Sequence, residues 1–382
     1  MSYPWEKEKW LPGVLSQRQV KKLIDQEFLE NFSGDSDPSA IDLHLTGEGY
    51  ELIRGSVKPY GERYTALLKD QTLSKRLDPD SEGFFKLQKK KCYVFRLKEK
   101  INFPKTEHHF YGQATARSSI GRMDVMARLI VDGMYQYESF SSDRVSSNSL
   151  FIEIIPISFN VRVKEGSSLS QLRFFYCSPE VSEINIEQIS NFLLYGGEHN
   201  DGTLSVDLSN VNVINGIRAS AFSIKKDLKN EEDYLDLFEK GKYDPSLYWD
   251  MLESIEINGT HRLEIEKERF YILRSKERIS LPKGVAVYCR AMDETLGEMR
   301  IHYAGFVHPG FGMNRNDKNV GTPLIFEVRG HDVNVNLADR EKLARLTFYR
   351  MSEESEIATD KTQDPKYLNQ SLTLSSIFKD WE

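Results

Sequence analysis

Two arginines, two serines and a glycine lie within six consecutive positions, and together they could bind phosphate. The segment runs from Arg117 to Arg122 and reads RSSIGR. Arginine offers a planar set of donors that fits phosphate oxygens, and serine hydroxyls can donate between them. Gly121 has no Cβ and lets the backbone approach a ligand closely. The segment is therefore a candidate phosphate-binding motif, although a polar turn between strands would have the same composition.

A glutamate on an apolar strand is the candidate proton carrier. Glu153 lies in LFIEII at 150–155 and shares one strand face with Phe151 and Ile155. A carboxyl group placed among apolar side chains is suited to moving protons near neutral pH. The alternative is a solvated glutamate on an edge strand.

Both candidates belong to a unit that occurs twice. In CYVFRLKEKINFPK and FYILRSKERISLPK, the residues Tyr, Arg, Lys, Glu, Ile, Pro and Lys recur at one constant offset. Further echoes follow in the same order along the chain, so chance is a poor explanation. We predict two copies of one fold, each of roughly 170 to 180 residues. The paired segments are 41–43 with 206–208, 92–105 with 270–283, 150–154 with 324–328, and 171–174 with 345–348.

Each copy is expected to be rich in β-strands, because short alternating apolar runs end at turn residues. We predict a mainly β fold of two tandem distorted β-barrels, jelly-roll-like, with few helices. The first copy spans 1–178, a linker spans 179–200, and the second copy spans 201–382 with a C-terminal tail. Ser16 is a candidate helix N-cap, and the charged stretch 230–252 is also predicted to be helical.

Composition limits the class of protein. The formal net charge of −7 argues against non-specific binding to nucleic acid, which requires a basic surface. We expect no signal peptide and no membrane span, since the chain has no apolar run long enough for either. Three widely spaced cysteines suit a reducing, cytoplasmic compartment.

The order of the motifs resembles that of the two-domain bacterial 2'-deoxycytidine 5'-triphosphate deaminases of the dUTPase superfamily. RSSIGR is similar to that family's phosphate motif. In the hairpin segment, His308 stands where the family has aspartate. The other matching segments are VLSQRQVKKLI at 14–24, SAIDLHL at 39–45, AGFVHPGFG at 304–312 and KYLNQ at 366–370.

The resemblance implies hydrolytic deamination of dCTP to dUTP and ammonia without zinc. The zinc deaminase signature H-x-E followed by P-C-x-x-C is absent from the sequence. Water must then be activated by a protein base, and the resemblance assigns this role to Glu153. It places Ser118 and Arg122 where they would hold the attacking water and the cytosine base near this glutamate. Mg²⁺ would enter with the triphosphate.

The resemblance also implies a substrate-binding set. Arg117 and Ser119 would hold the triphosphate, and a tail after Met351 would close over the nucleotide as a lid that the second barrel does not require. Tyr137 could equally be a core residue, the spacing from Glu138 to Glu153 is longer than usual, and the tail could be disordered. The remaining expected contacts are Tyr137 and Glu138 near the deoxyribose, His308 at a sugar hydroxyl, and Lys366, Tyr367 and Gln370 from the tail.

The second copy is expected to be degenerate and mostly structural. Where the first copy has RSSIGR, the second has RAMDET at 290–295, without the serines and the second arginine. Glu327 persists, but we expect Arg329 on its strand face to be its ion-pair partner. Chemistry is therefore expected to centre on the first copy.

Two other functions fit the same residues. The chain could be a dUTP pyrophosphatase or a bifunctional deaminase-pyrophosphatase, for which Glu138 is the one evident stand-in for a water-holding aspartate. It could also be a sensor that binds dCTP or dTTP without turnover.

Family members assemble around threefold axes, which implies a homotrimer.

Overall fold

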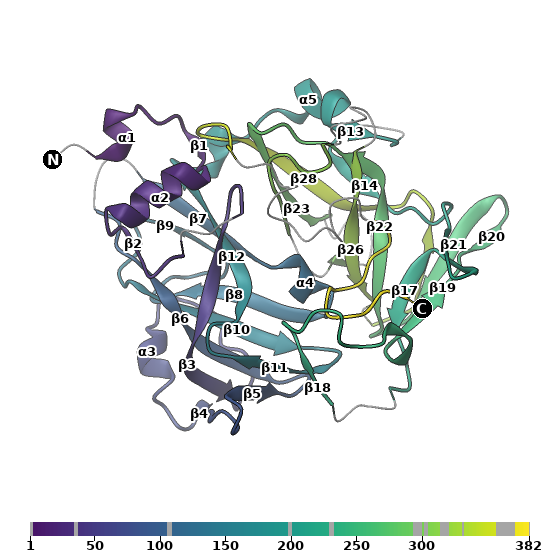
Figure 1. Cartoon of the computed structure of the whole chain (residues 1–382), viewed down its shortest axis with the longest axis horizontal. Helices are drawn as coiled ribbons and strands as arrows, with labels where there is room; N and C mark the ends of the chain where they lie inside the picture. The colour runs from purple at the N-terminus through teal and green to yellow at the C-terminus, as the bar shows by residue number, and fades with distance from the viewer. Residues whose placement is uncertain are drawn as a thin grey trace.

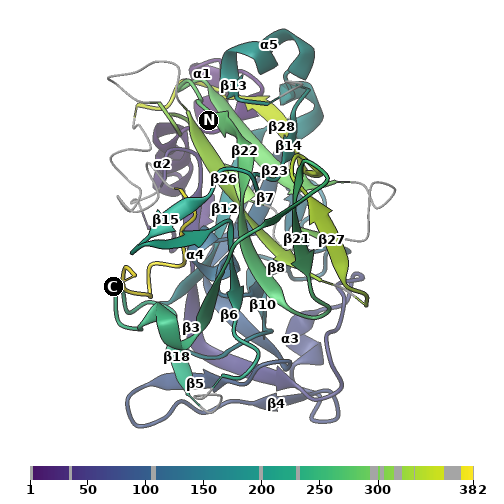
Figure 2. The same ribbon diagram turned by 90° about the vertical axis from the view of Figure 1, so that its right-hand side faces the viewer.

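The chain folds into two β-rich lobes that meet along a broad seam, as the computed structural model in Figures 1 and 2 shows. The lobes correspond to the two copies, and in Figure 1 the first extends from α1 and α2 at the upper left to β4 and β5 at the bottom. Among the described residues, no helix is long and apolar enough to cross a membrane. The structure describes residues 3–33, 37–104, 109–197, 201–228, 233–292, 300–301, 305–313, 321–330, 332–356 and 371–381.

The first copy is built on one curved antiparallel sheet. Its apolar residues alternate along the strands, so one face of each strand is buried. Near this sheet, β5 (Phe84–Leu87) and β11 (Asn160–Lys164) form a smaller one with β18 (Tyr234–Asp236) of the second copy. The order of the main sheet is β8 (Val125–Val131), β10 (Ser149–Pro156), β6 (Cys92–Ile101), β3 (Ile41–Leu52), β12 (Ser168–Tyr176), β7 (Phe110–Ala116) and β9 (Ser139–Ser141), with β1 (Gly13–Val14), β2 (Leu29–Glu30) and β4 (Ser74–Arg76) at its margins.

The second copy divides its strands between two larger sheets and two small ones. The first larger sheet has the order β19 (Trp249–Leu252), β17 (Ala221–Ile224), β22 (Phe270–Ile279), β26 (Thr322–Arg329) and β24 (Arg300–Ile301). The other has the order β14 (Thr203–Ser205), β28 (Lys342–Arg350), β23 (Val285–Ala291) and β25 (Gly305–Val307). The small sheets pair β15 (Asn212–Ile214) with β16 (Ile217–Ala219), and β20 (Ile255–Ile257) with β21 (Thr260–Ile265) and β27 (Val335–Ala338).

The strand pairing confirms the predicted mainly β fold with an internal duplication. The echoed segments form β6 and β22. β6 pairs antiparallel with β10, which carries Glu153, and β22 pairs antiparallel with β26, which carries Glu327. In the same way β12 pairs with β7, and β28 pairs with β23. The segment predicted as a linker holds η1 (Pro179–Ser182), α5 (Ile186–Leu193) and β13 (Leu194–Tyr195), and β13 pairs with β22.

One predicted helix is confirmed and the other is wrong. Ser16 caps α2 (Gln17–Asp25), and its hydroxyl accepts a hydrogen bond from the Gln19 amide at 3.2 Å. In the stretch predicted as a helix at 230–252, the described residues form β18, the 3₁₀ turn η2 (Pro245–Leu247) and β19. Pro245 interrupts any helix there, and the flanking strands bury Leu235 and Trp249. The other short helices are α1 (Pro4–Lys7), α3 (Tyr64–Leu67) and α4 (Ser118–Gly121).

One hydrophobic cluster spans both copies and includes side chains of the C-terminal segment 371–381, while a second cluster lies within the second copy and the segment before it. Phe159 of the first copy contacts Trp249 of the second, with ring centroids 6.1 Å apart. The expectation that the tail is a dispensable lid is wrong for this segment, because its apolar side chains are needed to fill the seam. Buried side chains of the segment are Leu372, Leu374, Ile377 and Phe378.

Candidate active site

The phosphate motif forms a short turn of helix that the two copies enclose between them. Arg117 is the N-cap of α4, and Arg122 is its C-cap. Ile120 is fully buried and anchors the turn in the core of the first copy. Asp124 adopts a left-handed conformation, with φ of 56°, that turns the chain into β8, and aspartate tolerates this region better than most residues. Figure 1 shows α4 at the centre of the molecule, between the two lobes.

Glu327 of the second copy lies directly against this turn. A Cβ atom added to Gly121 would stand 3.3 Å from the Glu327 carboxyl atoms, so glycine is what allows the close approach. Glu327 is 7% exposed. Burial raises the pKa of Glu327 to about 8, with Arg122 opposing the shift and Asp124 adding to it. A carboxyl group of this kind exchanges protons near neutral pH.

The C-terminal segment covers the other side of the motif. Arg122 donates a hydrogen bond to the Thr373 carbonyl at 3.2 Å. The Ser375 hydroxyl donates to the Ser119 carbonyl at 3.0 Å. In Figure 1 this segment passes beside α4. Three distant parts of the chain therefore meet here: the motif, the strand with Glu327 and the C-terminus.

Arg329 contacts the end of the motif, and the expectation that it pairs with Glu327 is wrong. Its guanidinium forms an ion pair with the Asp124 carboxylate and donates to the Ser158 hydroxyl at 2.7 Å. The reason is the packing of the two copies, which places Asp124 of the first copy against the Arg329 guanidinium, so Arg329 pairs with Asp124 and not with Glu327.

Two first-copy carboxylates lie near Arg117 and the hairpin of the second copy: Asp42 contacts Arg117, and Asp37 approaches His308. The Arg117 guanidinium donates to Asp42 at 2.7 Å, and burial raises the pKa of Asp42 despite this cation. The neighbouring Asp37 lies 3.7 Å from the His308 ring. His308 also shares a hydrogen bond of 3.0 Å with Ser39. The motif arginine and the hairpin histidine thus each approach an aspartate of the segment 37–42.

His308 is buried and neutral at physiological pH. Burial lowers its pKa to about 3, and the nearby charge of Arg173 contributes. Its approach to Asp37 is consequently a polar contact and not an ion pair. Arg173 is itself fully buried, and its guanidinium donates to the Val287 carbonyl at 3.0 Å and to the Ser39 hydroxyl at 3.2 Å. It therefore ties the hairpin sheet to the first copy.

Glu153 lies in a separate cluster within the first copy. Arg128 donates to its carboxylate with an N···O distance of 3.0 Å, and the Ser56 hydroxyl donates as well. The Tyr137 hydroxyl donates at 3.2 Å, and the Cys92 thiol lies at 3.4 Å. The Arg128 guanidinium stacks on the Tyr137 ring at 3.9 Å. The structure thus brings Glu153 and Tyr137 together, whereas Gly121 and Arg122 of the motif lie beside Glu327.

The remaining predicted residues are distributed differently. Glu138 accepts a hydrogen bond from the Leu129 amide at 2.8 Å, and desolvation raises its pKa to about 8. Ser118 is exposed on the outer side of α4. Lys366, Tyr367 and Gln370 lie outside the described residues. Their expected contacts with the nucleotide stay predictions.

The sequence predicted Glu153 as the proton carrier and Glu327 as part of a degenerate, mostly structural second copy. A signal was nevertheless present: the copies are complementary. The first copy carries RSSIGR without an HPGF hairpin, whereas the second carries HPGF at 308–311 followed by Glu327 without RSSIGR. Two half-sites of this kind make one site only when the copies meet.

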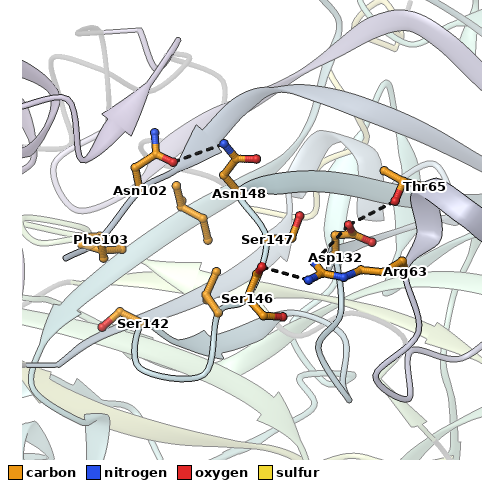
Figure 3. Close-up of a pocket in the computed structure, with 11 residues that line it drawn as sticks. Arg63, Thr65, Asn102, Phe103, Asp132, Ser142, Ser146, Ser147 and Asn148 are labelled. Atoms are coloured by element: carbon orange, nitrogen blue, oxygen red, sulfur yellow. Dashed lines mark hydrogen bonds and ion pairs between the residues drawn. The ribbon is translucent and has the colours of Figure 1, made fainter. Parts of the chain in front are cut away.

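A cleft of about 620 Å³ opens elsewhere in the first copy, and Figure 3 shows its lining. Its polar groups largely satisfy one another. Arg63 lies 3.5 Å from Asp132 and donates to the Ser146 carbonyl at 3.0 Å. Asn148 donates to Asn102 at 3.3 Å. The cleft contains none of the motif residues, so the seam remains the candidate site.

Comparisons with known proteins agree on one family. Residues 11–178 match the model of the 2'-deoxycytidine 5'-triphosphate deaminase (DCD) N-terminal domain, and residues 188–378 match that of its C-terminal domain. The chain is similar to the crystal structure of 2'-deoxycytidine 5'-triphosphate deaminase from Agrobacterium tumefaciens, with 26% sequence identity and a TM-score of 0.77. That match covers 90% of this chain and 97% of the other. No curated protein matches the sequence significantly. The chain therefore belongs to the 2'-deoxycytidine 5'-triphosphate deaminase family.

Proposed function

We propose that this protein hydrolyses dCTP to dUTP and ammonia at the seam between its two copies, with Glu327 as the proton carrier. The observation that carries the proposal is the contact of Glu327 with Gly121, next to Arg122. It joins a buried carboxyl group to a phosphate-type motif. Family membership supplies the substrate class.

The reaction needs one group that both takes and gives protons. Glu327 takes a proton from water as the water oxygen bonds to C4 of cytosine, and it delivers a proton to N3. It then passes the hydroxyl proton of the tetrahedral intermediate to the amino group, the C4–N bond breaks, and ammonia leaves. A pKa near 8 suits this role because both protonation states are accessible near neutral pH.

The motif residues would bind and orient the reactants. Arg122 lies beside Glu327, where its charge can stabilise the oxygen that forms at C4. Ser118 is exposed and can hydrogen-bond to water or to the base. The Arg117 side chain is 37% exposed, so it can exchange its bond with Asp42 for one with a phosphate. Ser119 would complete the phosphate contacts, and Mg²⁺ would accompany the nucleotide.

The mechanism requires no zinc in this proposal, because the proton carrier and the cation beside it come from the chain itself. Glu153 remains the competing candidate for the base. It is buried, but Arg128 already forms an ion pair with one of its carboxylate oxygens. Among the described residues, its hydrogen-bond partners include none from RSSIGR. We assign it a structural role.

From the family resemblance we propose that the protein is a homotrimer, and from its three widely spaced cysteines that it is cytoplasmic. Sedimentation equilibrium of the purified chain tests the trimer, since a monomer mass across a wide concentration range would contradict it.

The direct test supplies dCTP, CTP, dCMP and dUTP separately and measures ammonia and pyrophosphate. Ammonia from dCTP without pyrophosphate supports a deaminase. Pyrophosphate from dUTP indicates a pyrophosphatase or a bifunctional enzyme. Binding of dCTP or dTTP with neither product would indicate a non-catalytic sensor.

A further inference from the structure

One buried ion pair connects the two halves of the proposed site. Asp124 follows Arg122 by two residues, and Arg329 follows Glu327 by two residues on the same face of β26. The Asp124 side chain is fully buried, and that of Arg329 is 14% exposed. The pair therefore links the end of the motif in the first copy to the strand of the proton carrier in the second.

Further bonds hold this ion pair in place. The Ser158 hydroxyl donates to Asp124 and accepts from Arg329 at 2.7 Å, so the three side chains form a closed triangle. Arg329 also donates to the Glu268 carbonyl. On the motif side, the Asp124 amide donates to the Gly121 carbonyl at 2.9 Å. A shift of Asp124 would therefore be transmitted to the residue that touches Glu327.

We propose that the Asp124–Arg329 ion pair holds Glu327 in register with the phosphate motif across the seam, which makes Asp124 and Arg329 positioning residues for the reaction. This inference rests on the proposed function of Glu327. A buried ion pair is a weak source of stability, because desolvation offsets much of the attraction. Fixing the relative position of two elements is the role that this geometry supports.

The charges around Glu327 make the role measurable. Arg122 and Asp124 face it from the first copy, Arg329 follows it on β26, and the Cys289 thiol faces it from β23. Burial and Glu327 raise the pKa of Cys289 to about 12, so this thiol stays neutral. Of the two paired charges, Asp124 raises the pKa of Glu327. Removing one partner alone leaves the other charge uncompensated beside the carboxyl group.

The experiment measures the pH dependence of kcat and KM for dCTP in the full chain and in single and double variants. Asp124→Asn keeps the side-chain size and tolerates the left-handed backbone at this position. Arg329→Met removes the cation. Each should lower kcat by about 10- to 100-fold with little change in KM, because misplacement of a reacting group affects the chemical step.

Opposite pH shifts distinguish positioning from a general structural defect. The part of the kcat–pH profile that reports the titration of Glu327 is called its limb. In Asp124→Asn this limb should move to lower pH by about one unit. In Arg329→Met it should move to higher pH by about one unit. The double variant should return the limb towards its original position. Asp250→Asn is the matched control, since it breaks a comparable pair with Arg269, 2.7 Å apart, elsewhere on the sheet. It should leave the profile in place.

A spectroscopic titration makes the test independent of turnover. The carbonyl band of the protonated Glu327 side chain, assigned by its loss in Glu327→Gln, should titrate with the same opposite shifts. If the wild type releases no ammonia from dCTP, the proposed function fails, and this titration still decides the ion pair. If Arg329→Met does not fold, Arg329→Lys replaces it and should leave the titration unmoved while Asp124→Asn shifts it. Identical titrations in Asp124→Asn and the wild type would overturn the inference.

Discussion

Gly121 of the first copy and Glu327 of the second lie so close that a Cβ on Gly121 would be 3.3 Å from the Glu327 carboxyl group. This contact is between residues more than two hundred positions apart in the chain. It places the candidate proton carrier on the phosphate motif, and it is the relationship on which the functional proposal depends.

Gly121→Ala should reduce dCTP deamination by about tenfold or more without loss of stability. The φ of Gly121 is not positive, and alanine has a higher helix propensity than glycine. The added methyl group would instead displace the Glu327 carboxyl group, and small displacements of a reacting group are costly. Steady-state kinetics and thermal unfolding check both halves of the prediction.

Gly284→Ala is the control for this variant. Its Cβ would meet Glu354 at an ordinary 3.7 Å, away from the site. Equal activity losses in the two variants would show that the Gly121 contact is not special.

Stability should fall as the pH rises from about 5 to 8, partly because of Glu327. Its native pKa is raised to about 8 from the usual 4.5. In this window the native state holds a proton that the unfolded state has released, so raising the pH favours unfolding, by at most about 1.4 kcal/mol per pH unit for one group. Urea unfolding at several pH values should give a flatter profile for Glu327→Gln.

The matched control for the pH profile is Glu82→Gln, whose side chain is 69% exposed. It should leave the slope of the wild type unchanged. If Glu327→Gln has the wild-type slope as well, Glu327 is not the buried titrating group.

The C-terminus should separate into a core part and a nucleotide-binding part. Ile377→Ala should destabilise the protein by about 2–5 kcal/mol, because Ile377 is 1% exposed within the shared core. Lys366→Ala with Gln370→Ala should leave stability unchanged and raise KM for dCTP. Calorimetry and kinetics of the two variants test this division. Unchanged kinetics in the double variant would remove the tail from the proposed site.

Activity should survive removal of zinc when Mg²⁺ is restored for the nucleotide. The motivation is the absence of the zinc deaminase signature from the sequence. Dialysis against a strong chelator, followed by metal analysis and assay, makes the measurement. Stoichiometric zinc whose loss tracks the loss of activity would contradict the mechanism.

The sequence was sufficient to predict the duplication and the mainly β class. The segments that form β6 and β22 repeat both their residue types and their alternation, and alternation follows directly from strand geometry. The 230–252 stretch misled because charged residues at helical spacing also fit strands joined by a turn. There, burial of Leu235 and Trp249 against the other copy decides the structure.

The site was predictable only in part. RSSIGR identified the phosphate side from local chemistry alone. Its partner carboxylate was not predictable in this way, because which glutamate lies against Gly121 depends on how the two copies pack together. Glu153 and Glu327 hold corresponding positions in the echoed segments 150–154 and 324–328, so local patterns alone do not show which of them lies against the motif. Arg329 illustrates the same limit, as its partner Asp124 belongs to the other copy.

The most direct test of the central claim compares Glu327→Gln with Glu153→Gln, measuring ammonia release from dCTP and dCTP binding for each. The account predicts that Glu327→Gln loses at least about 10²-fold in kcat while still binding dCTP, because the amide keeps the shape but cannot carry a proton. Glu153→Gln should retain most of the activity of its folded fraction. The reverse pattern, with Glu153→Gln inactive and Glu327→Gln active, would contradict the seam site and return the chemistry to the first copy.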